Sequence, residues 1–249
     1  MRLSTYIIAS NEETNIGDCI ESCLEISDEV IVVHNDCSDN TIKIAESKGA
    51  TCFENEWSGY REQKAFALSK CSGTWALNLD ADERISEKLG INIINFINSI
   101  DNEVDIASFN RKSFFLGKWI NHGDWYPDEV KRLARNGKAF WSGGSVHEYL
   151  DSNGRCIKLK GDLLHFSYEN LNDLVKKNLL YTDLYLVDKK QVGTPPFFIV
   201  SIIFRCFWRF FRCYIIKLGF LDGFPGFVIS ISSAFCVFLK YCKILLESK

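Results

Sequence analysis

The sequence contains the run Leu77-Asn78-Leu79-Asp80-Ala81-Asp82-Glu83, in which an apolar segment turns abruptly acidic. Residues 74–79 are predicted to form a strand buried on both faces, because such strands read as nearly continuous apolar runs. After that strand, Asp80 and Asp82 can point to the same side of a turn. Hard divalent cations such as Mg²⁺ or Mn²⁺ prefer oxygen ligands and leave positions for phosphate oxygens. The turn is therefore a candidate metal and diphosphate site, with a solvated turn that caps a helix near Ser86 as the structural alternative.

The segments before this run alternate between strand-like and helix-like patterns. Residues 3–9 and 30–33 are short apolar runs with β-branched side chains, and apolar residues recur at helical spacing between them. This alternation indicates a right-handed βαβ series and a parallel sheet, which binds ligands beyond the carboxyl ends of its strands. Polar loops follow the predicted strands at residues 10–12, 34–39 and 80–82. We therefore expect these three loops to share one binding edge.

The pattern changes after residue 100. Residues 106–109 and 130–133 are predicted strands of a mixed sheet. The segment 114–149 holds several glycines and three tryptophans, Trp119, Trp125 and Trp141. Flat aromatic rings stack on sugar faces, and glycine lets a backbone approach closely. We therefore expect exposed loops here that suit a carbohydrate surface.

The composition is that of an ordinary globular protein. At 249 residues the chain fits one large domain, or one domain with an appendage, and can bury a sizeable core. Apolar residues make up 47% and charged residues 24%, and the formal net charge of −3 indicates no nucleic-acid partner. The ten cysteines form no CxxC pair, and several lie in apolar runs. Since Met1-Arg2 also leads straight into a strand-like run, we expect no secretory signal, reduced thiols, a cytoplasmic location and no zinc site.

The charge is unevenly distributed along the chain. From Phe197 onward seven Lys/Arg accompany two acidic residues, so this segment carries +5 and the remainder −8. Arg205, Arg209 and Arg212 recur at i, i+4 and i+7 among Phe, Trp and Ile, a pattern typical of a basic amphipathic helix in a membrane interface. The uncharged run 223–239 has 17 residues, fewer than the roughly 20 of a spanning helix, so no transmembrane segment is predicted. The alternative is a helical appendage that packs on the catalytic domain or on a second copy.

Two sets of segments form an order that matches a known family. The first set is Ile7-Ile8-Ala9-Ser10-Asn11-Glu12-Glu13, Asp28-Glu29-Val30-Ile31-Val32-Val33, Ser38-Asp39-Asn40-Thr41 and residues 77–83. The second set is Trp125-Tyr126-Pro127-Asp128, Lys131-Arg132-Leu133, Val146-His147-Glu148, Gly161-Asp162-Leu163-Leu164-His165-Phe166-Ser167-Tyr168 and Gly219-Phe220-Leu221-Asp222-Gly223. The first set resembles family 2 inverting glycosyltransferases of the GT-A fold. The second is similar to one branch of that family, the lipopolysaccharide core β-1,4-glucosyltransferases, so the resemblance covers nearly the whole chain.

The resemblance implies a site for a nucleotide-sugar donor. Asp82 would be the principal metal ligand, and Asp80 would contact the ribose or the metal. From the flanking sequence itself, Glu83 is expected to be only solvated. The other side chains implied at the donor are Ala9, Asn11 and Glu12 in the nucleotide pocket, Asp39 as support for its loop, and Gln63 and Lys64 nearby.

One position departs from the family pattern. His34 stands where the family usually carries an Asp that binds the base, and Asn35-Asp36 follow in place of Ser-Gly. Either His34 or Asp36 takes over base recognition, or that recognition is altered.

Inversion at an anomeric carbon needs a general base on the acceptor hydroxyl, and a carboxylate suits this role. The candidates are Glu148 and Asp128. Glu148 is favoured because it follows a loop with Gly143 and Gly144 that could approach a sugar, although a surface salt bridge is its structural alternative. Asp128 follows a proline and is also good turn chemistry. His165 is either a core histidine of an apolar strand or, as the resemblance allows, a third metal ligand.

These features predict an α/β enzyme with a GT-A (Rossmann-like) mixed sheet flanked by helices. We expect a catalytic domain over residues 1–190, with a nucleotide-sugar half (1–100) and an acceptor half (101–190), and a basic, aromatic helical appendage over 191–249 that associates with the membrane. The expected reaction is metal-dependent, inverting transfer of a hexose, with glucose as the first candidate, from a UDP-sugar to a lipopolysaccharide or lipooligosaccharide core acceptor. It would take place at the inner face of the cytoplasmic membrane.

Other functions stay open on the sequence alone. Transfer to a polyprenyl phosphate commonly goes with clear spanning helices, and the tail looks too interrupted for them. A peptide acceptor, or a membrane-peripheral scaffold with a degenerate GT-A fold, are further alternatives. A protein of the NAD-binding type is disfavoured because no GxGxxG follows the first strand.

Overall fold

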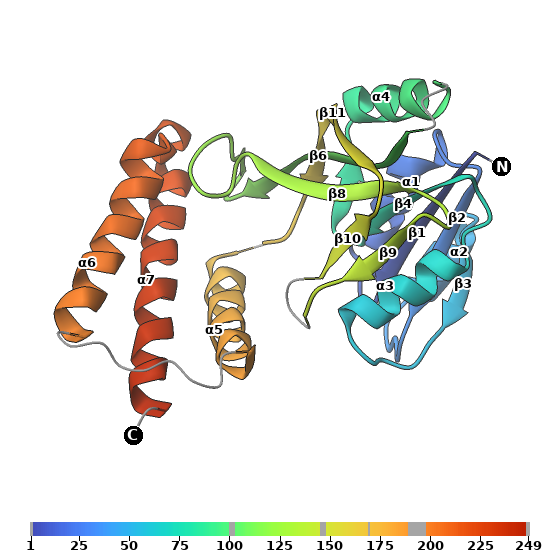
Figure 1. Ribbon diagram of the computed structural model, residues 1–249. Helices are drawn as coiled ribbons and strands as arrows, with labels where there is room; N and C mark the ends of the chain where they lie inside the picture. Colours follow the sequence, from blue (N-terminus) through green and yellow to red (C-terminus); the bar gives the residue numbers. More distant parts are fainter. Residues whose placement is uncertain (1, 100–102, 145–147, 169, 189–197, 248–249) are drawn as a thin grey trace. The chain divides into compact units, whose positions relative to one another are not determined.

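The computed structural model describes residues 2–99, 103–144, 148–168, 170–188 and 198–247, which form two compact units (Figure 1). The first unit comprises Met1–Arg111 and Glu129–His165, and the second comprises Lys112–Asp128 and Phe166–Lys249. This division does not follow the expected boundary at residue 190, because residues 112–128 and 166–188 group with the C-terminal helices. The two units are described separately below.

The first unit alternates strands and helices before it becomes mainly β. Its elements are β1 Leu3–Ala9, α1 Ile16–Leu24, β2 Glu29–His34, α2 Thr41–Ser47, β3 Thr51–Glu54, α3 Tyr60–Ser69, β4 Trp75–Asp80, β5 Glu83–Ile85, α4 Glu87–Ile97, β6 Val104–Phe115, β8 Asp128–Arg135, β9 Ala139–Ser142, β10 Tyr149–Ser152 and β11 Arg155–His165, with the end of β6 and the first residue of β8 passing into the second unit. The sheet order is β3-β2-β1-β4-β8-β6-β11-β5, and β9 and β10 form a separate hairpin.

The sheet is mixed, as the sequence predicted. Strand β1 pairs in parallel with both β2 and β4, and β2 pairs in parallel with β3. Strands β4 and β8 are antiparallel, as are β11 and β5. In the parallel part, Ala9 pairs with His34 and Ile8 with Asp80, so the ends of β1, β2 and β4 lie level. The three polar loops therefore leave the sheet at one edge.

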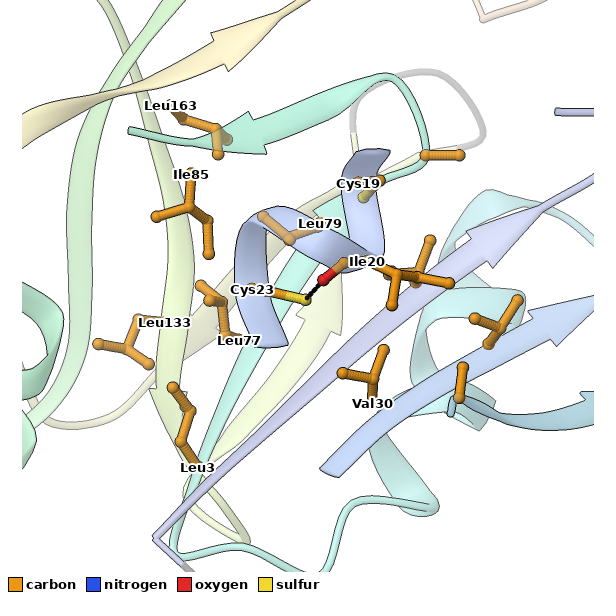
Figure 2. Close-up of a cluster of buried hydrophobic side chains, with 14 of the residues drawn as sticks. Leu3, Cys19, Ile20, Cys23, Val30, Leu77, Leu79, Ile85, Leu133 and Leu163 are labelled. Carbon is orange, nitrogen blue, oxygen red and sulfur yellow. Dashed lines mark hydrogen bonds between the residues drawn. The ribbon is translucent and has the colours of Figure 1, made fainter. Parts of the chain in front are cut away.

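The main core lies between the sheet and α1 (Figure 2). Leu77 and Leu79 of β4 are fully buried, and so are Cys19, Ile20 and Cys23 of α1. Burial raises the pKa of the Cys23 thiol to about 12, so it packs as a small neutral side chain. Each fully buried leucine contributes about 1.5–3 kcal/mol through removal from water. This packing fixes β4 and therefore the acidic turn that follows it.

The second unit joins a loop from the middle of the chain to the C-terminal helices. Its elements beyond the shared strands are β7 Lys118–Trp119, α5 Leu171–Asp188, α6 Phe198–Phe211, a π-helical turn Arg212–Ile216, a 3₁₀ turn Gly219–Asp222 and α7 Phe224–Glu247. Helices α6 and α7 pack side by side, and α5 packs on α7 (Figure 1). A small core unites Phe115 and Ile120 with Leu174, Cys213 and Ile229.

The expectation of exposed tryptophans for sugar stacking was wrong for Trp141, and the other two named tryptophans are half-buried. Trp141 is buried in the first unit and donates a hydrogen bond from Nε1 to the hydroxyl of Tyr6 (3.0 Å). In the second unit, Trp125 is stacked on Tyr168 with ring centroids 4.9 Å apart, and Trp119 packs edge-on against Phe166. Trp141 thus belongs to the interior of its unit, whereas Trp119 and Trp125 are half-buried rings that pack against aromatic partners distant in sequence.

The expectation that the tail is too interrupted for a long apolar helix was also wrong. Helix α7 is continuous over 24 residues, and its portion Phe224–Leu246 is long and apolar enough to cross a membrane by length and composition alone. Pro225 and Gly226 lie in its first turn, where proline and glycine do not interrupt a helix. An added Cβ at Gly226 would meet the carbonyl oxygen of Gly219 at 1.9 Å, so this glycine lets the 3₁₀ turn approach α7.

The basic face foreseen on α6 is only partly free. Arg209 and Arg212 converge with Lys217 on the carboxylate of Asp124, at 3.1, 3.0 and 2.9 Å. Arg205 instead donates to Ser201 and lies over the ring of Tyr241. Part of the predicted interfacial charge is thus engaged within the protein.

Candidate functional site

The loops after β1 and β2 are joined by side-chain hydrogen bonds. Asn11, with a φ of 55°, accepts hydrogen bonds at Oδ1 from the backbone N–H (2.8 Å) and the hydroxyl (3.1 Å) of Ser38. The backbone N–H of Glu12 donates to Thr41 Oγ1 (2.7 Å). These bonds place the two loops as one polar rim at the sheet edge.

Asp39 accepts hydrogen bonds from both sides of this rim. Its carboxylate accepts from the hydroxyl (2.6 Å) and backbone N–H (3.0 Å) of Thr41, and from the backbone N–H of Glu13 (3.0 Å). The hydrogen bond from the Thr41 hydroxyl is the main cause that holds the pKa of Asp39 below its ordinary value. Asp39 is thus ionised at neutral pH and links the loop before α1 to the first turn of α2.

His34 ends β2 with a buried and unsatisfied ring nitrogen. Its side chain is buried, and Nδ1 finds no hydrogen-bond partner among the residues that the structure describes. A buried polar atom without a partner is costly, so such an atom at a binding edge is a natural contact for a ligand. Asp36, two residues on, is exposed and has a φ of 44°.

Asp80 lies between two cations. Its Oδ1 is 3.1 Å from Lys64 Nζ, and its other oxygen pairs with the guanidinium of Arg132. Burial alone would raise the pKa of Asp80, but Arg132 and then Lys64 outweigh burial and hold the pKa well below the ordinary range. The negative charge of the Asp80 carboxylate is therefore already balanced by two cationic side chains.

Glu83 is buried, which corrects the expectation that it is only solvated. Its side chain is 0% exposed and lies 2.8 Å from Arg132 and 3.5 Å from Arg111. It also accepts a hydrogen bond from the backbone N–H of Asp80 (2.9 Å). The Asp80 and Glu83 carboxylates in turn hold the pKa of Arg132 above its ordinary value, although burial opposes this. Glu83 and Arg132 thus support the acidic turn from the protein interior. In the sequence, Arg132 stood out only as part of a segment that resembles the family.

Replacing Arg132 by leucine is expected to destabilise the fold by about 3–5 kcal/mol, because it leaves the buried Glu83 and the half-buried Asp80 without their shared cation. The measurement is chemical unfolding followed by circular dichroism. Arg155→Leu is the matched control, since Arg155 forms an exposed pair with Glu103 (3.7 Å) and such pairs contribute about 0–1 kcal/mol. Equal, small losses in the two variants would contradict the buried role of Arg132.

Lys64 connects the acidic turn to Glu148. Its side chain is 4% exposed, and Nζ lies 3.0 Å from Glu148 Oε1 as well as 3.1 Å from Asp80. The same ammonium lies over the ring of Trp141, 5.0 Å from its centroid. Lys64 and Glu148 lie 84 residues apart in the sequence, and the fold brings their side chains into contact. Gln63 points elsewhere: it is buried and exchanges hydrogen bonds with Asn55.

Asp82 and His165 face each other beside this cluster. Asp82 Oδ2 lies 3.3 Å from His165 Nε2, because β11 pairs with β5 in a register that sets His165 opposite Glu83. A carboxylate oxygen and an imidazole nitrogen at this separation fit one divalent cation by geometry and donor chemistry. Within the described part of the chain no group of three or more His, Cys, Asp or Glu gathers as a complete metal site. Phosphate oxygens and water would have to supply the remaining ligands.

The other candidate residues are placed without a test of their roles. Ala9 is buried at the end of β1. Asp128 begins β8 and falls in the second unit, whereas Glu148 falls in the first. Residues 145–147, which precede Glu148 in the loop foreseen to approach a sugar, lie outside the described residues.

Comparison with known proteins identifies the family. The family model for glycosyl transferase family 2 matches residues 4–153. The chain is 32% identical over 254 residues to an uncharacterized glycosyltransferase of Rickettsia typhi, covering 98% of this chain and 86% of that one. It is 30% identical over 254 residues to the lipopolysaccharide core biosynthesis glycosyltransferase LpsC of Rhizobium meliloti, covering 97% and 91%.

A solved structure shares the fold. The crystal structure of S. aureus TarS 1–349 in complex with UDP superposes with a TM-score of 0.50 at 16% identity, over 90% of this chain and 75% of that one. The chain therefore belongs to glycosyl transferase family 2 and is a glycosyltransferase, with the GT-A type of fold predicted from its sequence.

Proposed function

We propose that this enzyme transfers a hexose, with glucose as the first candidate, from a UDP-sugar to a lipopolysaccharide or lipooligosaccharide core acceptor with inversion. The observation that carries the proposal is the cluster at the acidic turn, where Asp82 faces His165 while Lys64 joins Asp80 to Glu148. The name of LpsC supports the core acceptor, and the TarS complex supports UDP as the nucleotide.

The donor side of the mechanism rests on Asp82 and His165. These residues would hold a Mg²⁺ or Mn²⁺ ion, which when bound offsets the negative charge that develops on the leaving diphosphate. Lys64 and Arg132 add fixed positive charge next to Asp80, and Asp80 itself, already paired with both, is better suited to the ribose than to the metal. Asn11, Glu12 and Asp39 would then shape the nucleotide end of the pocket.

The acceptor side of the mechanism rests on Glu148. Its carboxylate would take the proton from the acceptor hydroxyl as the oxygen forms a bond to the anomeric carbon. The bond from that carbon to the UDP oxygen breaks at the same time on the opposite face, so the configuration inverts and UDP leaves. Asp128 is the alternative base.

A donor screen tests this proposal. The purified protein is incubated with a panel of nucleotide sugars, and release of the nucleoside diphosphate is measured with Mn²⁺, with Mg²⁺ and with excess chelator. Turnover of UDP-glucose, lost in chelator, is the expected result. His34→Asp is measured beside the wild type, because the unpartnered Nδ1 of His34 makes it the candidate for base recognition, and an altered preference among bases is expected only if His34 contacts the base. Turnover of no nucleotide sugar by the wild type would favour the scaffold alternative.

Membrane contact through α6 and α7 is part of the proposal. Large apolar side chains are exposed along both helices, and monomeric soluble proteins rarely expose apolar patches of this extent. The exposed residues include Val200, Ile203, Phe204, Phe207 and Trp208 on α6, and Phe224, Phe227, Ile231, Phe235 and Phe238 on α7. Because much of the nearby positive charge pairs with Asp124, apolar burial is the main expected force. The proposal places the enzyme in the cytoplasm, held peripherally at the inner membrane face.

The double variant Phe204→Glu/Phe207→Glu is expected to weaken binding to phosphatidylcholine vesicles by at least about a hundredfold, since each phenylalanine gains about 1.5–3 kcal/mol from leaving water. Flotation on a density gradient gives the measurement. Phe140→Glu in the first unit, also an exposed phenylalanine, is the control and should float as the wild type does. A soluble wild-type dimer that never floats would assign the apolar faces to a second copy.

Helix α7 also favours a second candidate acceptor. Transfer to a polyprenyl phosphate was disfavoured because the tail seemed unable to form a long apolar helix, and α7 removes that objection. A polyprenyl phosphate is therefore added to the donor screen together with a labelled nucleotide sugar. Label that appears on the polyprenyl phosphate would identify this lipid as the acceptor.

A further inference from the structure

The second unit contains one buried carboxylate surrounded by three cations. The Asp124 side chain is 6% exposed, and Arg209, Arg212 and Lys217 reach it at 3.1, 3.0 and 2.9 Å. The cationic side chains are each 37–40% exposed, so their remaining surfaces are accessible to a ligand. We call these four residues the Asp124 cluster.

The loop that carries Asp124 is held in place at three consecutive backbone groups. The backbone N–H groups of Asn121 and His122 donate to the buried carboxylate of Asp222 (3.1 and 2.8 Å). The next N–H, of Gly123, donates to the carbonyl of Lys217 (2.9 Å). Asp124 therefore meets the cations in a fixed position, and its carboxylate orders side chains that would otherwise be free to spread into solvent.

The Asp124 cluster has surplus charge and surplus donors. Three cations and one carboxylate leave a net charge of +2. Two guanidinium groups and one ammonium carry thirteen N–H donors. Among the described residues, these donors make one hydrogen bond of good geometry, from Arg212 to Asp124. Arg209 Nε is buried without a hydrogen bond, although it lies 3.1 Å from Asp124. Paired guanidinium groups with free donors match the geometry of phosphate oxygens.

The surroundings of the Asp124 cluster are apolar and exposed. Trp208 and Phe211 flank Arg209 and Arg212 in sequence on α6, and Ile215 and Ile216 follow in the π-helical turn; all four are exposed. Arginine and lysine next to exposed aromatic and aliphatic side chains are typical of segments at the depth of lipid head groups. A phosphate held there would lie at that depth.

We infer that Arg209, Arg212 and Lys217, ordered by Asp124, form a binding site for a phosphate group. The phosphate could belong to a lipid head group or to a soluble phosphorylated molecule, and the two sources share the same chemistry. The inference does not depend on sugar transfer, and it rests on the proposed membrane contact only where the phosphate belongs to a lipid.

The test compares vesicles that differ in the chemistry of their negative charge. Phosphatidylcholine vesicles contain either phosphatidic acid or oleate, adjusted to the same zeta potential, and binding of the full-length protein is measured by flotation. Arg212→Gln and Lys217→Gln each remove one cation from the Asp124 cluster, whereas Arg205→Gln removes an exposed cation of α6 outside it. Lys217→Gln serves as the milder variant if Arg212→Gln impairs folding, and thermal melting reports on this for all of them.

The expected result is a preference of the wild type for phosphatidic acid over oleate that falls about fivefold in each cluster variant and is kept in Arg205→Gln. In a second arm, inorganic phosphate is added without vesicles. Stabilisation of the wild type against melting, absent in Lys217→Gln, would identify a soluble phosphate as a ligand of the site. Equal binding to both vesicle types with no response to inorganic phosphate would overturn the inference, as would equal losses in Arg205→Gln and the cluster variants. Binding of all proteins to neutral vesicles reports separately on the proposed membrane contact.

Discussion

Replacing Asp82 by asparagine is expected to lower the rate of sugar transfer by roughly a thousandfold, with little change in the free energy of unfolding. Asparagine keeps the size of the side chain but removes the negative charge that would hold a divalent cation against the diphosphate. Asp82 faces His165 at the edge of β11, and its side chain is 22% exposed, so we expect its charge to contribute little to the stability of the fold. Steady-state release of UDP in a titration of Mn²⁺ gives the measurement.

Two controls separate loss of the metal from general damage. Asp18→Asn removes a well-exposed carboxylate of the same unit, paired with Arg84 at 3.6 Å, and should leave transfer unchanged. His165→Ala should raise the Mn²⁺ concentration needed for half-maximal activity, because it removes the second proposed ligand. Full activity of Asp82→Asn, or unchanged wild-type activity in excess chelator, would refute the metal-dependent mechanism.

Replacing Glu148 by glutamine is expected to lower turnover by about 10²–10⁴-fold with donor binding nearly intact, because glutamine cannot accept the proton of the acceptor hydroxyl. Turnover is measured at saturating donor and acceptor, and donor affinity is measured separately by calorimetry. Glu129→Gln, which alters an exposed pair with Lys158 (2.8 Å), is the matched control. A near-normal rate would move the base to Asp128.

The contact between Glu148 and Lys64 suggests a different explanation that the same series can exclude. If Glu148 only positions Lys64, Glu148→Gln should have no further effect in a Lys64→Met background. If Glu148 is the base, the loss should persist in that background. The double-mutant cycle therefore distinguishes a chemical role from a positioning role.

The sequence predicted the parts of the fold that depend on local pattern. The apolar runs at β1, β2 and β4 identified parallel strands, and the polar loops after them do leave the sheet at one edge. Those strands are buried on both faces, so their composition reveals them directly. The register of the sheet then places the loops side by side.

The interior of the site could not be predicted in the same way. Glu83 looked solvated because glutamate is almost never buried unless it is paired, and its partner Arg132 lies 49 residues away on β8. Lys64 was assigned to the donor by resemblance, whereas its contact with Glu148 depends on the packing of α3 near the β9–β10 hairpin. Pairings of this kind depend on tertiary structure, which no local periodicity encodes.

Aromatic residues misled for a related reason. A tryptophan near glycines is compatible with a sugar platform or with a packed interior, and only the partners decide. Trp125 stacks on Tyr168, and Trp141 donates a hydrogen bond to Tyr6.

In the tail, the count of uncharged residues stopped at Lys240, although α7 continues through Lys240 and Lys243 to Glu247.

The small core that unites Phe115 and Ile120 with Cys213 and Ile229 has a practical consequence for purification. A common way to improve the solubility of an enzyme with exposed apolar helices at its C-terminus is to delete those helices. Here that deletion would uncover two side chains that are at most 1% exposed and would release the loop that Asp222 holds. The shortened protein would lose one exposed apolar surface and gain another. Detergent extraction of the intact chain is therefore the better route to active protein.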